Sequence, residues 1–259
     1  MDIDAYLARL GYFGPRAPTA ATLAALHLLH LQAVPFENLD IGRGVPIVLD
    51  LEALYAKLIT HRRGGFCYEL NGVFAELLRA LGYSVDLLSA RVWGGGVFGP
   101  EFDHLALRVT GGALPEPLLA DVGFGQSFLQ PLRLVPGVEQ ADTSGRYRLT
   151  QTGAEWRLDA LEAGAVEWAP SYTFTLTPRE FGDFAEMCVY QQAAPDSHFR
   201  QGPICSRATP EGRVSLSTGK LIVTAHGQRT EQALPDLTAW NAALHRHFGI
   251  VLATDPVFS

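Results

Sequence analysis

The sequence has little cysteine, and the cysteines it has are not spaced as metal ligands or as a disulfide framework. Cys67, Cys188 and Cys205 are an odd number and form no CxxC pair, and no HExxH motif is present. Structural zinc sites and disulfide-rich folds need paired, closely spaced cysteines. The sequence therefore predicts neither a metal site nor a disulfide scaffold, and it is typical of a cytoplasmic protein with reduced thiols.

Basic runs and long apolar runs are also missing. The 259 residues carry 20 Lys and Arg against 27 Asp and Glu, and the densest basic cluster, His61–Arg63, is too short for a nucleic-acid patch. The richest apolar stretch, residues 23–34, is interrupted by two histidines and a glutamine, so it falls short of the roughly 18 residues of a membrane span. The acidic start, Met1–Asp4, is unlike a signal peptide. We expect no nucleic-acid or membrane partner.

What the sequence does contain is a helical first third followed by short strands. Apolar spacing and capping residues predict helices over residues 3–10, 19–34, from Asp50 to about 58, and from Gly65 to Gly82. Strands are expected at 84–93, 104–109, 118–122, 146–150, 154–158 and 172–176, in a sheet curled into a barrel or sandwich. A capping box at Thr177–Glu180 predicts a helix to about Gln191, followed by a hairpin (213–217 and 220–225) and a last helix, 235–248. This order indicates an α+β fold.

The stretch from Arg63 to Asn71, RGGFCYELN, places a cysteine directly after two glycines and at the start of a helical pattern. Two glycines permit a sharp turn into a helix, so we expect Cys67 in the first helical turn. Unpaired N–H groups and the helix dipole favour a negative charge there, which would lower the pKa of the thiol. A buried structural cysteine could occupy the same position, and the motif alone leaves both interpretations open.

His104 and Asp121 flank a turn that would bring them together. His104 begins an apolar strand, Asp121 ends the next one, and Gly111–Pro115 lies between them. The midpoint of the two residues falls within that turn, so a hairpin would set their side chains nearly opposite, on one face. A carboxylate in that position fixes the imidazole tautomer and stabilises its cation, and the other ring nitrogen can deprotonate a thiol.

Cys67, His104 and Asp121 together predict a nucleophilic site with the chain order of thiol proteases. They do not name the substrate. Gly123 and Gly125, followed by Gln126, are candidates for binding a coenzyme phosphate through exposed backbone N–H groups, although the Lys-Ser/Thr of a Walker loop is missing.

The stretch from Arg63 to Asn71 resembles the nucleophile motif of the arylamine N-acetyltransferases. PFENL at 35–39 and DVGFG at 121–125 match two further motifs of that family, and PDSHF at 195–199 and CSRATP at 205–210 are similar to its late segment. The likeness extends from about Arg9 to Pro210 or beyond. The chain lacks the long insertion of the vertebrate members, so it resembles the bacterial type.

This resemblance implies an α+β fold with a cysteine-protease-like catalytic core and three parts. These are a helical bundle carrying the nucleophile (1–82), a β-barrel carrying the histidine and aspartate (83–190) and an α/β lid (191–259). By motif position, Cys67 is the nucleophile, His104 the base and Asp121 the residue that orients the base. The acceptor pocket would be lined by Phe36, Val92, Phe98, Phe124 and Phe199. Arg9, Glu37 and Arg63 resemble the family's buried ionic cluster, which supports the cysteine from behind.

The implied reaction is a ping-pong transfer of an acetyl group from acetyl-CoA, through a thioester of Cys67, to an arylamine, arylhydrazine or N-hydroxyarylamine. The expected partners are acetyl-CoA, as a co-substrate, and small aromatic amines or hydrazines, with no permanently bound cofactor and no metal. Three alternatives stay open: a thiol hydrolase or transglutaminase-like enzyme, an amide synthase of the same fold that takes its acyl group from a carrier protein, and a binding module without turnover.

Overall fold

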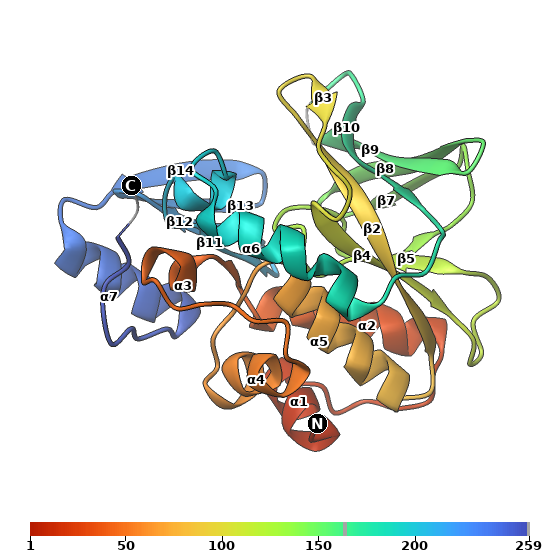
Figure 1. The fold of residues 1–259 in the computed structure, drawn as a ribbon, viewed down its shortest axis with the longest axis horizontal. Coiled ribbons are helices and arrows are strands. Elements are labelled where there is room, and N and C mark those ends of the chain that lie inside the picture. The colour runs from red at the N-terminus through yellow and green to blue at the C-terminus, as the bar shows by residue number, and fades with distance from the viewer. Residues whose placement is uncertain (163–164, 258–259) are drawn as a thin grey trace.

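Helices from the first eighty residues form the base of the molecule, and two sheets stand on it (Figure 1). The computed structural model describes residues 1–162 and 165–257. The helices of the base are α1 (Ile3–Leu10), α2 (Ala20–Ala33), α3 (Leu39–Gly42), α4 (Leu51–Tyr55), the π-helix η1 (Ala56–Thr60) and α5 (Cys67–Ala80). The side chains of Thr19 and Asp50 cap α2 and α4, as the sequence predicted, and Asp2 caps α1.

Helix α5 is the central element of the base. Eleven of its fourteen residues are buried, and Leu70, Phe74 and Leu77 have no exposed surface. A helix that is apolar nearly all round must be covered on every side. Helix α5 packs against α1 and α4 and against two strands of the larger sheet, which fixes the position of its first residue, Cys67.

The larger sheet consists of β2 (Ser84–Gly94), β3 (Val97–Phe98), β4 (His104–Thr110), β5 (Leu118–Ala120), β6 (Leu132–Arg133), β7 (Glu139–Asp142), β8 (Gly145–Thr152), β9 (Glu155–Glu162) and β10 (Ala169–Thr175). Its order is β6-β5-β4-β2-β10-β9-β8-β7, with β3 paired to β2, and all these pairs are antiparallel. A bridge between Pro136, just after β6, and Leu149 of β8 draws the two ends together. The sheet is therefore nearly closed, in agreement with the expected barrel.

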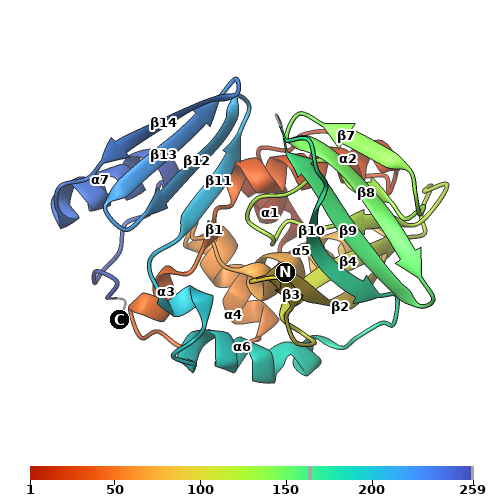
Figure 2. The same cartoon turned by 90° about the horizontal axis from the view of Figure 1, so that it is seen from above.

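The smaller sheet pairs a short strand from the N-terminal helical region with four strands from the C-terminal part of the chain. Its order is β1 (Phe36–Glu37), β11 (Cys205–Thr209), β12 (Gly212–Ser217), β13 (Lys220–Ala225) and β14 (Gln228–Ala233). Helix α7 (Leu237–Phe248) packs on it through Trp240, Leu244 and Phe248, which share a core with Val214 and Leu216. Figure 2 shows the two sheets on either side of the helices, with α7 beside the smaller one.

A helical segment crosses from one sheet to the other and differs from the prediction. It comprises the 3-10 helix η2 (Phe181–Phe184), α6 (Ala185–Ala193) and the 3-10 helix η3 (His198–Arg200) (Figure 2). The predicted capping box at Thr177 is wrong, because Arg179 still bridges to Leu87 of β2. The helical turn begins only after Glu180, whose backbone N–H donates to Asp183.

No helix within residues 1–162 and 165–257 combines the length and apolar composition needed to cross a bilayer.

Candidate active site

The start of α5 is held close to the strand β1. The carbonyl oxygen of Pro35 accepts from the N–H of Gly65, and the N–H of Glu37 donates to the carbonyl of Gly65. A Cβ on Gly64 would lie 2.0 Å from the Pro35 oxygen. Neither glycine has a positive φ, so a left-handed turn conformation is not the reason for them. Gly64 is required because the two backbones nearly touch, and a Cβ on Gly65 would lie 2.6 Å from the carboxylate of Glu69.

His104 and Asp121 form the polar pair of the site. His104 Nε2 lies 2.7 Å from Asp121 Oδ2, and both side chains are almost completely buried. Because Nε2 faces the carboxylate, Nδ1 is the ring nitrogen available to a reacting group. Burial alone would raise the pKa of Asp121, but the charge and hydrogen bonds of His104, with those of Asn71 and Gly123, lower it overall.

The register of the hairpin differs from the expected one by two residues. Leu107 pairs with Ala120, and Val109 pairs with Leu118. Continued by one residue, this register sets Asp121 opposite Ala106 and diagonal to His104. His104 still contacts Asp121 because His104 and Ala106, two residues apart on β4, have their side chains on the same face. The prediction that the two residues are nearly opposite is wrong, whereas the shared face is correct.

Asn71 connects the cysteine helix to this pair. It lies one turn after Cys67 on α5, and its Nδ2 donates to Asp121 Oδ1 (2.8 Å) and to the Leu105 carbonyl (2.6 Å). Its Oδ1 accepts from the N–H of Val122. The buried amide thus uses its donor and its acceptor groups, which fixes α5 relative to the strands carrying His104 and Asp121.

The environment of Cys67 corrects the prediction about its acidity. Burial raises the pKa of the Cys67 thiol well above its usual value, while a hydrogen bond with the backbone of Leu105 acts in the opposite direction. Burial therefore opposes the lowering of the pKa that was expected from the helix start. A thiol in this environment needs a nearby base to ionise, and His104 is the neighbour of Leu105 in β4.

Cys67 and His104 open into one cavity of about 630 Å³ between the two sheets. The aromatic and aliphatic residues of its wall are Phe36, Val92, Trp93, Phe124, Phe199, Ile204 and Leu216, and its polar residues are Asp103, Gln126, Gln191, His198, Ser206, Ser215 and Ser217. Phe98, expected in the pocket, is not among the lining residues. It packs instead edge-on against Trp93, with ring centroids 4.8 Å apart, and Trp93 takes its place in the wall.

The glycines after Asp121 have different roles. A Cβ on Gly123 would lie 2.8 Å from Cys67 Cα and 2.7 Å from Asn71 Nδ2, so this glycine allows the loop to pack on the helix start. Gly125 has a φ of 87°, which a side chain would strain. Gly123, Gly125 and Gln126 all line the cavity, where their polar groups could meet a coenzyme.

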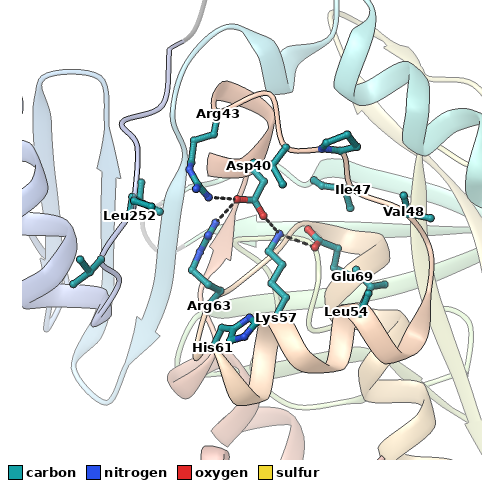
Figure 3. Close-up of a pocket in the computed structure, with 15 residues that line it drawn as sticks. Asp40, Arg43, Ile47, Val48, Leu54, Lys57, His61, Arg63, Glu69 and Leu252 are labelled. Atoms are coloured by element: carbon teal, nitrogen blue, oxygen red, sulfur yellow. Dashed lines mark hydrogen bonds and ion pairs between the residues drawn. The ribbon is translucent and has the colours of Figure 1, made fainter.

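An ionic cluster lies behind the cysteine, in a second cavity of about 520 Å³ (Figure 3). Arg63 pairs with Glu37 at 2.7 Å and with Asp40 at 2.9 Å. Lys57 also belongs to the cluster, because its ammonium forms ion pairs with Asp40 (2.8 Å) and Glu69 (2.7 Å). Glu69 also accepts from the N–H of Phe66, the residue before the cysteine. Burial raises the pKa of Glu69 to about 6, although the charge of Lys57 opposes the change.

Arg9 does not belong to this cluster. Its guanidinium donates to the backbone carbonyls of Leu58 (3.4 Å) and Arg62 (3.5 Å) and forms no ion pair with Glu37. The prediction that Arg9 contributes to the cluster is therefore wrong. It stabilises the turn before Arg63 instead.

Sequence reasoning missed several of these residues. Lys57, Asp40 and Glu69 complete the ionic cluster, and no local pattern indicated that their charges converge. Asn71 belongs to the cysteine motif but had no predicted role, although its spacing of four from Cys67 puts both on one helix face. Within the described part of the chain, no group of three or more His, Cys, Asp and Glu side chains is arranged to hold a metal ion.

Comparisons with known proteins find similar chains along nearly the whole length. The sequence pattern of the N-acetyltransferase family matches residues 19–257. The arylamine N-acetyltransferase of Mycolicibacterium smegmatis is 37% identical over 257 residues, covering 97% of this chain and 93% of that protein. That of Escherichia coli K12 is 35% identical over 252 residues, covering 96% and 88%. The structure of Mycobacterium marinum arylamine N-acetyltransferase in complex with CoA matches with a TM-score of 0.89 and 34% identity, covering 96% and 93%.

Proposed function

The chain belongs to the arylamine N-acetyltransferase family, whose members are acetyl-CoA-dependent acyltransferases, and from this premise we propose a ping-pong mechanism with Cys67, His104 and Asp121 as its catalytic residues. The observation that carries the proposal is the buried His104–Asp121 pair, which opens into the same cavity as the cysteine at the start of α5. Acetyl-CoA acts as a co-substrate that leaves as CoA in each turnover.

In the first step, the Cys67 sulfur forms a bond to the acetyl carbon of acetyl-CoA and the thioester bond to CoA breaks. His104 removes the thiol proton through Nδ1 and returns it to the departing CoA sulfur. Because burial raises the pKa of the thiol, proton transfer to His104 is required for the attack. Asp121 stabilises the imidazolium that forms.

In the second step, the amine nitrogen attacks the acetyl group on Cys67, and the bond between this carbon and the sulfur breaks. His104 takes the proton from the amine and returns it to the cysteine sulfur, which restores the free enzyme. The thioester is formed from another thioester and is reactive toward amines. Water must be kept from it, and the buried position of Cys67 serves that purpose.

The cavity suggests how the two substrates share the site. Phe36, Phe124 and Phe199 offer aromatic faces suited to the flat ring of an arylamine or arylhydrazine. Ser206, Ser215 and Ser217, on β11 and β12, line the same cavity, and the hydroxyl oxygen of Ser217 is itself buried without a hydrogen-bond partner. We assign these hydroxyls, with Gly123, Gly125 and Gln126, to the coenzyme side.

The experiment is intact-mass spectrometry after incubation with acetyl-CoA and no amine. Wild-type protein is expected to gain one acetyl group, which a later addition of an aniline or a hydrazide removes. Cys67→Ala should gain none, whereas Cys188→Ala, which removes another buried cysteine, should behave as wild type. No adduct on the wild type, or an equal adduct on Cys67→Ala, would contradict the proposal.

A panel of donors and acceptors separates the alternatives. Acetyl-CoA and propionyl-CoA tested against several anilines and hydrazides give the acyl and amine preferences together. A carrier-protein-dependent amide synthase would give adducts only with an acylated carrier protein, and a thiol hydrolase would cleave amides without CoA. We place the enzyme in the cytoplasm because its nucleophile must stay reduced.

A further inference from the structure

A second histidine contacts Asp121 at its backbone, whereas His104 contacts the carboxylate. His27 comes from the middle of α2, is fully buried and does not line the catalytic cavity. The backbone N–H of Asp121 donates to His27 Nε2 at 3.1 Å. His27 Nδ1 lies 3.0 Å from the carbonyl oxygen of Leu129. The aspartate is therefore held between two imidazoles, one on its carboxylate and one on its backbone.

The partners of His27 determine its tautomer without any assumption about pH. A carbonyl oxygen can only accept, so Nδ1 must carry the proton that bonds to Leu129. A backbone N–H can only donate, so Nε2 must be bare where it meets Asp121. A second proton on the ring would turn Nε2 into a donor facing another donor. The ring is therefore neutral as long as both bonds exist.

The packing around His27 leaves the ring one orientation. It stacks on Phe128 with centroids 5.6 Å apart and an interplanar angle of 10°, and it meets Phe74 of α5 edge-on at 6.3 Å. Phe128 and Phe74 have no exposed surface. The ring thus joins α2, α5 and the loop after β5 in a single packed unit.

The backbone N–H of Asp121 needs a side-chain acceptor such as His27. Strand β5 ends at Ala120, so the N–H of Asp121 lies beyond the ladder that it would otherwise join. This N–H is buried, and a buried donor without an acceptor is costly. A peptide that rotates to find another acceptor would also turn the carboxylate away from His104.

We propose that His27 is a positioning residue for the catalytic reaction, because its bare Nε2 fixes the Asp121 peptide and thereby the direction in which the carboxylate presents itself to His104. This inference rests on the proposed function for its kinetic consequence only. The continuous path is Leu129 carbonyl, His27, Asp121 backbone, Asp121 carboxylate and His104.

Helix α2 supplies a matched control. His30 lies one turn after His27, is equally buried, and neither of its ring nitrogens has a hydrogen-bond partner. His27→Leu removes the acceptor for Asp121, whereas His30→Leu removes a buried imidazole that bonds to nothing. His27→Gln keeps an amide oxygen that can accept from Asp121 and an amide N–H that can donate to Leu129.

The kinetic test measures single-turnover release of CoA from acetyl-CoA. For His27→Leu we expect the acylation rate to fall by tenfold or more with the KM for acetyl-CoA changed less than twofold. His27→Gln should recover most of the rate, and His30→Leu should match wild type. Equal rates in His27→Leu and wild type, with both folded by circular dichroism, overturn the proposal, as does a loss that His27→Gln does not recover.

A spectroscopic test does not depend on acyl transfer. In ¹⁵N-histidine NMR spectra of the wild type, His27 should show the neutral tautomer protonated at Nδ1. In His27→Leu the ring signals of His104 should move, while His30→Leu should leave them in place. His27 protonated at Nε2, or His104 signals that do not respond to His27→Leu, overturns the inference. A wild type that forms no acetyl adduct contradicts the proposed function alone.

Discussion

Asn71 Nδ2 donates to Asp121 Oδ1 at 2.8 Å, so the helix that begins with Cys67, the proposed nucleophile, is bonded directly to the carboxylate of Asp121. The other carboxylate oxygen faces His104. The two oxygens of Asp121 therefore have separate roles, since one fixes the carboxylate to α5 and the other holds the imidazole. Cys67, His104 and Asp121 come from three different parts of the chain, and the Asn71 amide joins the helix of Cys67 to the segments that carry the other two.

Asn71→Ala should impair both catalysis and stability. It leaves the buried N–H of Val122 and the carbonyl of Leu105 without their partners, and each such loss costs about 1–3 kcal/mol. We expect kcat/KM to fall by tenfold or more and the midpoint of urea unfolding to fall with it. Asn241→Ala, which removes an exposed amide paired with Asp255, should change neither. Wild-type kcat/KM in Asn71→Ala would show that the amide does not position Asp121.

Gly123→Ala tests the contact between the loop and the helix start. The added Cβ would lie 2.8 Å from Cys67 Cα, where only a backbone shift can relieve the clash. We expect a loss of tenfold or more in the acylation rate, measured by single-turnover CoA release. The control is Gly182→Ala, because a Cβ there meets no atom within 4 Å. An acylation rate within twofold of wild type in Gly123→Ala would disprove the tight contact.

Lys57→Met should destabilise the protein strongly, since it leaves Asp40 and the buried Glu69 without their shared cation. Breaking a buried ion pair by removing one partner costs about 3–5 kcal/mol, and urea unfolding measures this loss. Lys220→Met, whose ion pair with Glu231 is half exposed, should cost less than about 1 kcal/mol. The double variant Lys57→Met/Glu69→Gln should regain part of the loss. Equal effects of the two lysine variants would contradict a structural role for the cluster.

His30 should make stability depend on pH. Burial, with the charge of Arg9, lowers its pKa well below the usual 6.5. As pH falls below about 6.5, the unfolded chain binds a proton that the folded chain does not, so the free energy of unfolding decreases by about 1.4 kcal/mol per pH unit from this group. Above pH 7 the contribution is constant. His30→Leu should therefore flatten the pH dependence in acid, measured by urea unfolding from pH 7 to 5. Parallel curves for the two proteins would contradict this.

Local signals predicted the elements that have local causes. Thr19 and Asp50 cap their helices because an N-cap side chain bonds only three residues away. Gly11 and Gly249 end helices in the left-handed conformation that glycine favours. The longer strands β2, β4 and β8 were found for the same reason, since alternation and turn residues lie within the segment itself.

Long-range partners were not predictable in the same way. Strand β1 has two residues, too few for any period, and it exists only because β11 pairs with it. The ionic cluster gathers Glu37, Asp40, Lys57, Arg63 and Glu69 from β1, α3, η1, the loop after η1 and α5. The prediction of a lowered pKa for the Cys67 thiol left out the effect of burial. The helix start can be read from the sequence, whereas the burial, which raises the pKa, cannot. Phe98 was expected in the cavity, but its place is taken by Trp93.

The short strand β1 ties the C-terminal sheet to the catalytic half of the molecule. Phe36 pairs with Ser206 on one side and bridges to Gly65 on the other, while its ring forms part of the cavity wall. The smaller sheet therefore cannot move away from the helices without breaking the backbone pairing next to Cys67, the proposed nucleophile. During synthesis, residues 36 and 37 cannot pair with β11 until residues 205–206, and so most of the chain, have been made.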